Sequence, residues 1–204
     1  LGRLFEPMSQ FQVYFLEGKN HILDYQFGYD HILFVIALCA LYLMRDWKKV
    51  LVLVTASTIA HSLTLALVAT NVISVSEKLV EFLIPLTIFI TAFSNLFKSE
   101  ESINDRRMQM NYAYALFFGL IHGLGFSNYF RAILGRDRSI VSQLFAFNVG
   151  LEFGQLLIVG IFLLASFIFV DLFGVARRDW KLVISSAVAG IAVILMKDKA
   201  YWLD

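Results

Sequence analysis

Long apolar runs separated by short polar connectors dominate the pattern along this chain. A membrane-spanning helix needs about 20 mostly apolar residues, and about six stretches approach or exceed that length. They run from 28 to 45, 50 to 71, 78 to 97, 112 to 134, 140 to 170 and 181 to 197. The pattern predicts an all-α fold, a polytopic transmembrane helical bundle of about six spanning helices. A seventh span is left open, because the fifth run is unusually long.

The residues before the first run have a different character. The segment FQVYFLEGKNHILDYQF mixes aromatic and charged residues too densely to cross lipid, which favours an interfacial helix or a re-entrant turn. We therefore divide the chain into an interfacial, extracytoplasmic segment, 1–27, and a single transmembrane helical domain, 28–204. The opening residues LGRLFEPM contain no charged region followed by an apolar one, so any signal peptide is missing from this sequence, and whether one was removed by processing is left open.

Composition supports a membrane location and narrows the partners. The chain is 59% hydrophobic and 16% charged, with a mean hydropathy of +0.72, which is typical of an integral membrane protein surrounded by lipid. The net charge is only +1 and the basic residues are scattered, which argues against nucleic-acid binding. Lysine and arginine near the helix ends favour an outside N-terminus, mainly because Arg45, Lys48 and Lys49 occupy the first loop.

Five ionisable residues interrupt the apolar runs. An ionisable side chain at the bilayer centre costs roughly 2.5–3.5 kcal/mol on insertion scales, so we expect these residues to face one another. Imidazole and carboxylate together suit a divalent first-row metal such as nickel, zinc, cobalt, copper or iron. The alternative is that each histidine only hydrogen-bonds a neighbouring helix. The predicted metal ligands are Asp30, His31, His61, His122 and Glu152.

Other polar residues lie at spacings that suit a supporting role. Asn148, Glu152 and Gln155 share one face of the fifth predicted helix, and Ser57 lies one turn from His61. Such groups orient ligating imidazoles, although hydroxyls also commonly bond to carbonyls of their own helix. The expected supporting or pathway residues are His21, Asp24, Ser57, Ser62, Thr64, Glu81, Asn148 and Gln155.

Two pairs of glycines surround two of the predicted ligands. Gly119 and Gly123 flank His122, and Gly150 and Gly154 flank Glu152. Small residues at this spacing let membrane helices approach closely. We expect the fourth and fifth predicted helices to meet at these glycines.

Four motifs occur in order between Gly28 and Gln155, and they read GYDHILF, AHSLTL, FGLIHGLGF and FNVGLEFGQ. Together they resemble the signatures of the HupE/UreJ family of small membrane proteins. The resemblance implies a metal permease or accessory protein of the bacterial inner membrane, concerned with nickel uptake or delivery, with a metalloenzyme maturation partner. The metal residues it implies are Asp30, His31, His61, His122 and Glu152. The family's nickel branch has a histidine upstream of the Asp-His pair and further histidines near His122, so the identity of the metal is left open.

Two functions remain open from the sequence. A permease or delivery protein would take a divalent cation from outside and pass it inward, which requires binding weak enough to release the ion. An intramembrane zinc hydrolase acting on a lipid-like substrate would hold zinc with three histidines, with Asp30 or Glu152 as general base. The HxxxH pair of ceramidase-like hydrolases is missing here, so we favour the permease or delivery protein, which is not an enzyme.

Overall fold

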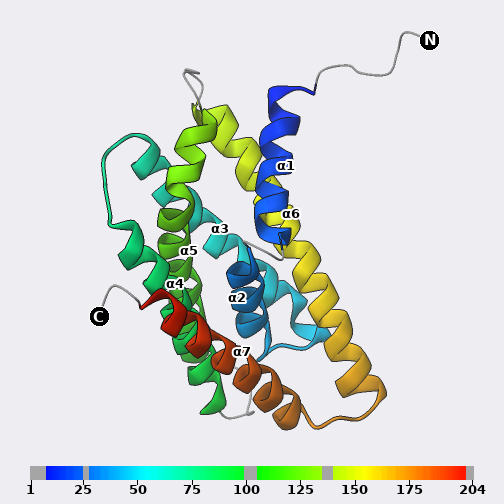
Figure 1. Cartoon of the computed structure of the whole chain (residues 1–204). Helices are drawn as coiled ribbons and strands as arrows, with labels where there is room; N and C mark the ends of the chain where they lie inside the picture. The colour runs from blue at the N-terminus through cyan, green and yellow to red at the C-terminus, as the bar shows by residue number, and fades with distance from the viewer. Residues whose placement is uncertain (1–7, 25–27, 99–104, 135–139, 201–204) are drawn as a thin grey trace, which may run out of the picture.

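The chain folds into helices that run along and across one another. The computed structural model describes residues 8–24, 28–98, 105–134 and 140–200, and within these ranges there are helices and no strands. The all-α prediction is confirmed. A 3-10 turn, Met44–Asp46, precedes α3, and a π-helical segment, Phe167–Leu172, extends α6. The α-helices are α1 (Gln10–Leu23), α2 (Tyr29–Cys39), α3 (Trp47–Ala69), α4 (Glu77–Leu96), α5 (Asp105–Leu134), α6 (Ile140–Ser166) and α7 (Arg177–Lys199) (Figure 1).

Among the residues that the structure describes, four helices are long and apolar enough to cross a membrane. They are Met44–Ala69, Glu77–Leu96, Ile140–Leu172 and Arg177–Lys199. The helix expected to be the first span, α2, has 11 residues, so it is only about 16 Å long at 1.5 Å per residue, half of a ~30 Å hydrocarbon core. The long helix α5 is less apolar and is not among the four. A count of six spans therefore stays a prediction.

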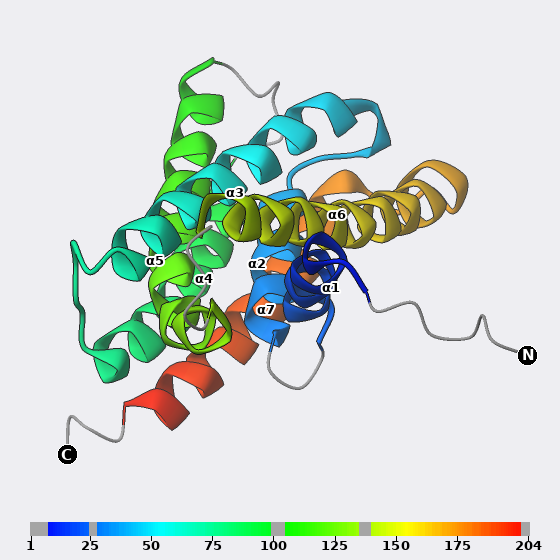
Figure 2. The same cartoon turned by 90° about the horizontal axis from the view of Figure 1, so that it is seen from above.

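The helices associate mainly as three pairs around a central short helix. The closest associations join α3 to α5, α1 to α6 and α4 to α7. In the view from above, α2 lies in the middle of the arrangement (Figure 2), and it contacts α4, α6 and α7. The N-terminal helix α1 is therefore attached to the bundle along α6.

Glycines allow two of these pairs to approach closely. A Cβ atom on Gly119 would overlap the backbone of α3 at Ser57, and one on Gly123 would overlap α3 at Thr64. Gly150 and Gly154 of α6 pack against α1 instead. The expectation that these glycines join the fourth and fifth predicted helices to each other is wrong. Each pair fits a different partner, because the spacing of small residues marks a close approach without specifying the neighbour.

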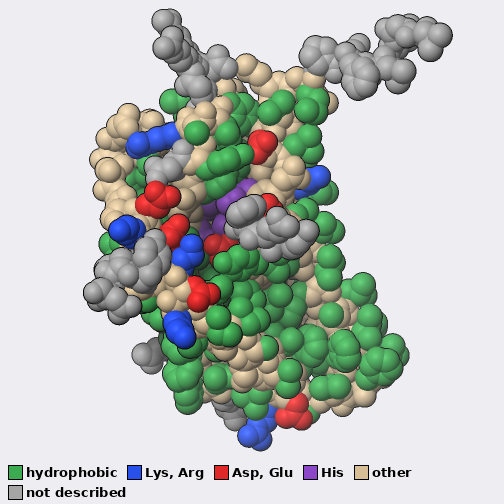
Figure 3. Space-filling view, in the orientation of Figure 1, with side chains coloured by type: hydrophobic (Ala, Val, Ile, Leu, Met, Phe, Trp, Pro, Cys, Tyr) green, Lys and Arg blue, Asp and Glu red, His purple; other side chains and the backbone are tan. Residues whose placement is uncertain are grey.

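Basic residues gather at one end of the bundle, where α2 and α4 end and α7 begins. The Arg177 guanidinium donates to the Leu41 carbonyl at 2.8 Å, and the Lys181 ammonium donates to the Lys98 carbonyl at 2.6 Å. Cations in these positions stabilise the negative ends of the helix dipoles. Figure 3 shows a largely apolar lower half with charged side chains at its lower edge. This basic end lies away from the histidines described below.

Candidate metal site

The junction between α1 and α2 brings two histidines together. Gly28 precedes α2, and its N–H donates to the Asp24 carbonyl at 2.8 Å. A Cβ atom on Gly28 would overlap the carbonyl oxygen of His21, so only glycine lets α2 begin so close to the end of α1. As a result, the ring centres of His21 and His31 lie 4.6 Å apart.

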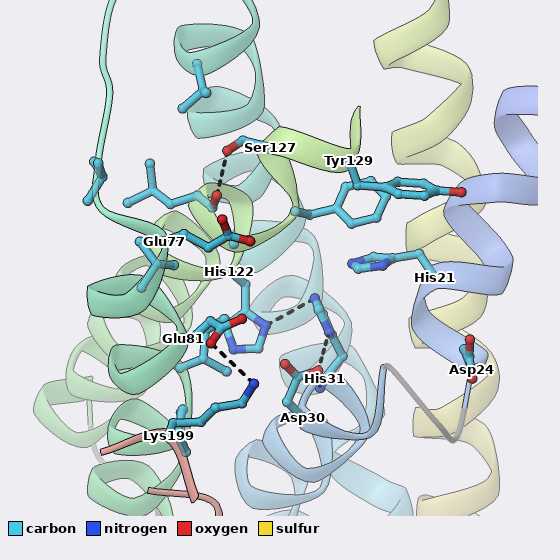
Figure 4. A pocket seen from close by; sticks show the side chains of 18 of the residues that line it. His21, Asp24, Asp30, His31, Glu77, Glu81, His122, Ser127, Tyr129 and Lys199 are labelled. Carbon is cyan, nitrogen blue, oxygen red and sulfur yellow. Dashed lines mark hydrogen bonds and ion pairs between the residues drawn. The ribbon is translucent and has the colours of Figure 1, made fainter. Parts of the chain in front are cut away.

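His31 is the centre of the cluster and its ring contacts are well defined. Its Nδ1 lies 2.8 Å from Asp30 Oδ1, and its Nε2 lies 3.1 Å from His122 Nδ1. The backbone N–H of His31 donates to the same Asp30 oxygen at 2.7 Å. The ring centre of His61 is 6.0 Å from that of His31. Four histidines from α1, α2, α3 and α5 thus lie near one another, and Figure 4 shows three of them, His21, His31 and His122.

One arrangement of protons satisfies all of these contacts. An ionised Asp30 carboxylate only accepts, so His31 donates from Nδ1 and keeps a lone pair on Nε2. His122 then donates from Nδ1 to that lone pair. Among the described residues, Nε2 of His21, His61 and His122 is buried with no hydrogen-bond partner. Buried polar atoms are normally paired, so the free nitrogens of His21 and His61 beside the His31–His122 pair point to a ligand that binds here.

A metal ion shared by His31 and His122 would replace the proton between His31 Nε2 and His122 Nδ1, which would move to His122 Nε2, and the distance between the two ligating nitrogens fits such an ion. Metal–nitrogen bonds of about 2.0–2.1 Å at a tetrahedral angle place two ligand nitrogens roughly 3.3 Å apart, and these two lie 3.1 Å apart. One ligand atom each from Asp30, His31 and His122 lie within 4.8 Å of one another. A histidine that binds a metal through one ring nitrogen is commonly oriented by a hydrogen bond from the other. The Asp30 carboxylate accepts such a bond from His31.

The electrostatics of His21 suit metal binding as well. Burial, and then repulsion from His31 and His61, lower the pKa of His21 well below its usual value of 6.5. The ring is therefore neutral at pH 7, which is the form that binds metals. His21 was expected from the sequence only as a supporting residue, and the structure places it beside His31.

An acidic cavity leads to the cluster. It has a volume of about 640 Å³, and His21, His31 and His122 line it. Figure 3 shows histidine side chains inside a hollow with acidic side chains around it. Its two basic lining residues are engaged: Lys199 lies 3.4 Å from Glu81, and Arg131 Nε donates to a backbone carbonyl at 2.9 Å. The excess of carboxylates attracts cations. The acidic lining residues are Glu17, Asp24, Asp30, Glu77 and Glu81.

Aromatic rings close the side of the cluster that faces the basic end. Phe34 lies one turn beyond His31 on α2, and Phe118 lies one turn before His122 on α5. The two phenyl rings are stacked with 5° between their planes, and the ring centre of Phe118 is 3.5 Å from that of His122. The cluster is therefore open toward the cavity and blocked by stacked rings toward the basic end.

Glu152 and Gln155 lie away from the cavity lining, between α3 and α6. The Thr55 hydroxyl donates to the Glu152 carboxylate at 2.6 Å, and the Thr58 hydroxyl donates to the Gln155 amide oxygen at 2.8 Å. Sequence reasoning missed the two threonines. Their signal was their spacing, since Thr55, Thr58 and His61 recur every three residues on one helix.

Three of the remaining predicted supporting residues bond to their own helices. Ser62 donates to the carbonyl one turn back at 2.7 Å, Thr64 donates to the His61 carbonyl at 3.0 Å, and Asn148 donates to a carbonyl one turn back at 2.8 Å. Ser57 is buried where α5 crosses α3. Glu81, one of the expected supporting or pathway residues, lines the cavity.

One of three comparisons with known proteins found a match. A family model described as "HupE / UreJ protein" matches residues 3–203, almost the whole chain. Neither the curated proteins nor the solved structures gave a match.

Proposed function

Because the chain belongs to the HupE/UreJ family, we propose that it is a membrane permease or delivery protein for a divalent transition-metal ion such as nickel. The His31–His122 pair would hold the ion, oriented by Asp30 and completed by His21 and His61. The observation that carries this proposal is the 3.1 Å separation of the His31 and His122 ring nitrogens beneath an acidic cavity. Imidazole-rich sites favour nickel, copper, zinc and cobalt over magnesium and calcium.

The proposed route begins at the cavity and leads toward the basic end. Carboxylates at the cavity collect the hydrated cation, which then exchanges water for imidazole at His31 and His122. Onward passage requires the stacked rings of Phe34 and Phe118 to separate, because they lie directly beyond the two histidines. The basic end suits the cytoplasmic face, so we place the cavity and the N-terminus outside.

Charge around the cavity favours a carrier over a zinc hydrolase. A hydrolase acting on lipid needs an opening to the bilayer wide enough for an acyl chain. Carboxylates and two basic side chains line this cavity, which suits an opening to water. We therefore propose a protein that carries the metal rather than one that uses it for hydrolysis.

Metal content of the purified protein tests the shared site. Elemental analysis should find bound metal in the wild type, and His31→Ala and His122→Ala should each lose it. Ser62→Ala is the control, because its hydroxyl bonds only to its own helix among the contacts above. Unchanged metal in both histidine variants would sink the proposal. Uptake of radiolabelled metal into proteoliposomes then tests transport, and it should be absent in His122→Ala.

A further inference from the structure

A second group of polar side chains lies between α3 and α6. Thr55 donates to Glu152 at 2.6 Å, and Thr58 donates to Gln155 at 2.8 Å. Residues three apart on a helix are neighbours, so the two hydrogen bonds form adjacent rungs between the same two helices. The result is a patch of oxygen atoms from one carboxylate, one amide and two hydroxyls.

The chemistry of this patch differs from that of the histidine cluster. Its potential ligands are oxygen atoms, with no imidazole or thiol. Oxygen ligands suit hard cations such as alkali and alkaline-earth ions, whereas imidazole suits first-row transition metals. A cation bound here would therefore be of a different class from the proposed cargo.

A bound cation would compensate the negative charge of the Glu152 carboxylate. Glu152 lies within a candidate membrane span, where an uncompensated charge is costly. The ion pairs formed by the described residues involve Asp30, Asp46 and Glu81, and none involves Glu152.

The number of charges selects a monovalent ion. One carboxylate and three neutral oxygen donors become neutral when a single positive charge is added, whereas a divalent ion would leave a net charge in the span. We propose that Thr55, Thr58, Glu152 and Gln155 bind a sodium ion. This assigns Glu152 to its own site instead of the transition-metal site.

The position of the sodium site suggests what it does. Thr58 and His61 lie one turn apart on α3, so a shift of α3 on sodium binding would move a member of the histidine cluster. Sodium would then act as the coupling ion for metal movement. This coupling role rests on the proposed function, whereas sodium binding itself does not.

Thermal unfolding of purified protein in detergent tests sodium binding. The protein is first treated with a chelator, and sodium chloride then replaces choline chloride at constant ionic strength. A ligand that binds the folded state raises the melting temperature with its concentration. The wild type should gain several degrees in a saturable manner. Glu152→Gln and Thr55→Val should lose the gain, whereas Thr55→Ser, which keeps the hydroxyl, should retain it.

Two outcomes would overturn the sodium site. One is the absence of sodium-specific stabilisation in the wild type, and the other is an equal gain in Glu152→Gln. Transition-metal binding by Glu152→Gln shows that this variant is folded. If Glu152→Gln does not fold, the sodium site is tested by comparing Thr55→Val with Thr55→Ser.

The two proposals fail separately. His122→Ala should lose transition-metal binding and keep the sodium response. If the wild type binds no transition metal but still responds to sodium, the proposed function fails and the sodium site stands. If sodium is bound but a sodium gradient leaves metal flux in proteoliposomes unchanged, the coupling role is refuted.

Discussion

Replacing Asp30 by asparagine tests how the metal ligands are held in place. Asp30 Oδ1 accepts from the backbone N–H of His31 at 2.7 Å and pairs with the His31 ring at 2.8 Å. Asparagine has the same shape but no charge. The change therefore weakens the bond that keeps the proton on His31 Nδ1 and leaves Nε2 free for the metal.

The expected loss follows from that one contact. A hydrogen bond to a charged group contributes about 1.5–3 kcal/mol, which corresponds to roughly 10- to 100-fold in affinity. Loss of an outer group that orients a metal ligand typically costs the same 10–100-fold. We therefore expect Asp30→Asn to bind metal weakly, whereas His122→Ala should not bind it measurably.

Calorimetric titration of nickel or zinc into chelator-treated protein measures the ratio of dissociation constants. Glu77→Gln is the matched control, because it removes a carboxylate from the same cavity without touching His31, and its affinity should change by less than about threefold, roughly 0.7 kcal/mol. An equally small change in Asp30→Asn would refute the orienting role. Loss as complete as in His122→Ala would instead make Asp30 a direct ligand.

Three further substitutions test the fold, the cavity and its closed side. In a denaturant titration, Gly119→Ala should lower the free energy of unfolding by about 1–3 kcal/mol, because the new Cβ atom overlaps the backbone of α3. The control is Gly160→Ala, which should not be destabilising because its Cβ atom would have no neighbour within 4 Å. Lys199→Met should change stability by less than about 1 kcal/mol but speed metal association in stopped-flow measurements, and an effect that persists at high salt would contradict the electrostatic reason. Phe118→Leu should increase metal leakage from loaded proteoliposomes, whereas Phe117→Leu should not, because that side chain is 57% exposed.

Hydrophobic patterning predicted the class of fold and most of the apolar helices. Runs of apolar residues have a length that can be compared with the bilayer, so four candidate spans emerged close to their observed bounds. The same reasoning misjudged α2, because residues 40–44 are apolar enough to extend the run although the helix ends at Cys39. Length of an apolar run does not reveal where a helix stops.

The site was harder to anticipate than the spans. His31 and His122 stood out because burying an ionisable group in an apolar run is costly, and the structure brings their rings together. His21 was undervalued because its own segment is polar, and its burial arises from contacts with other helices, such as its ring contact with Phe126. The surroundings of Glu152 depend on which helix crosses α6, which spacing along one helix cannot tell.

The histidine cluster lies where two pairs of helices and the short helix α2 meet. His21 belongs to the α1–α6 pair, His61 and His122 belong to the α3–α5 pair, and His31 comes from the short helix between them. Glycines make each of the two pairs a tight unit. A metal ion held by these rings would link the α1–α6 pair to the α3–α5 pair. Its binding would hold the two pairs together and its release would let them move, so under the proposed function the transported ion would itself set how rigid the protein is.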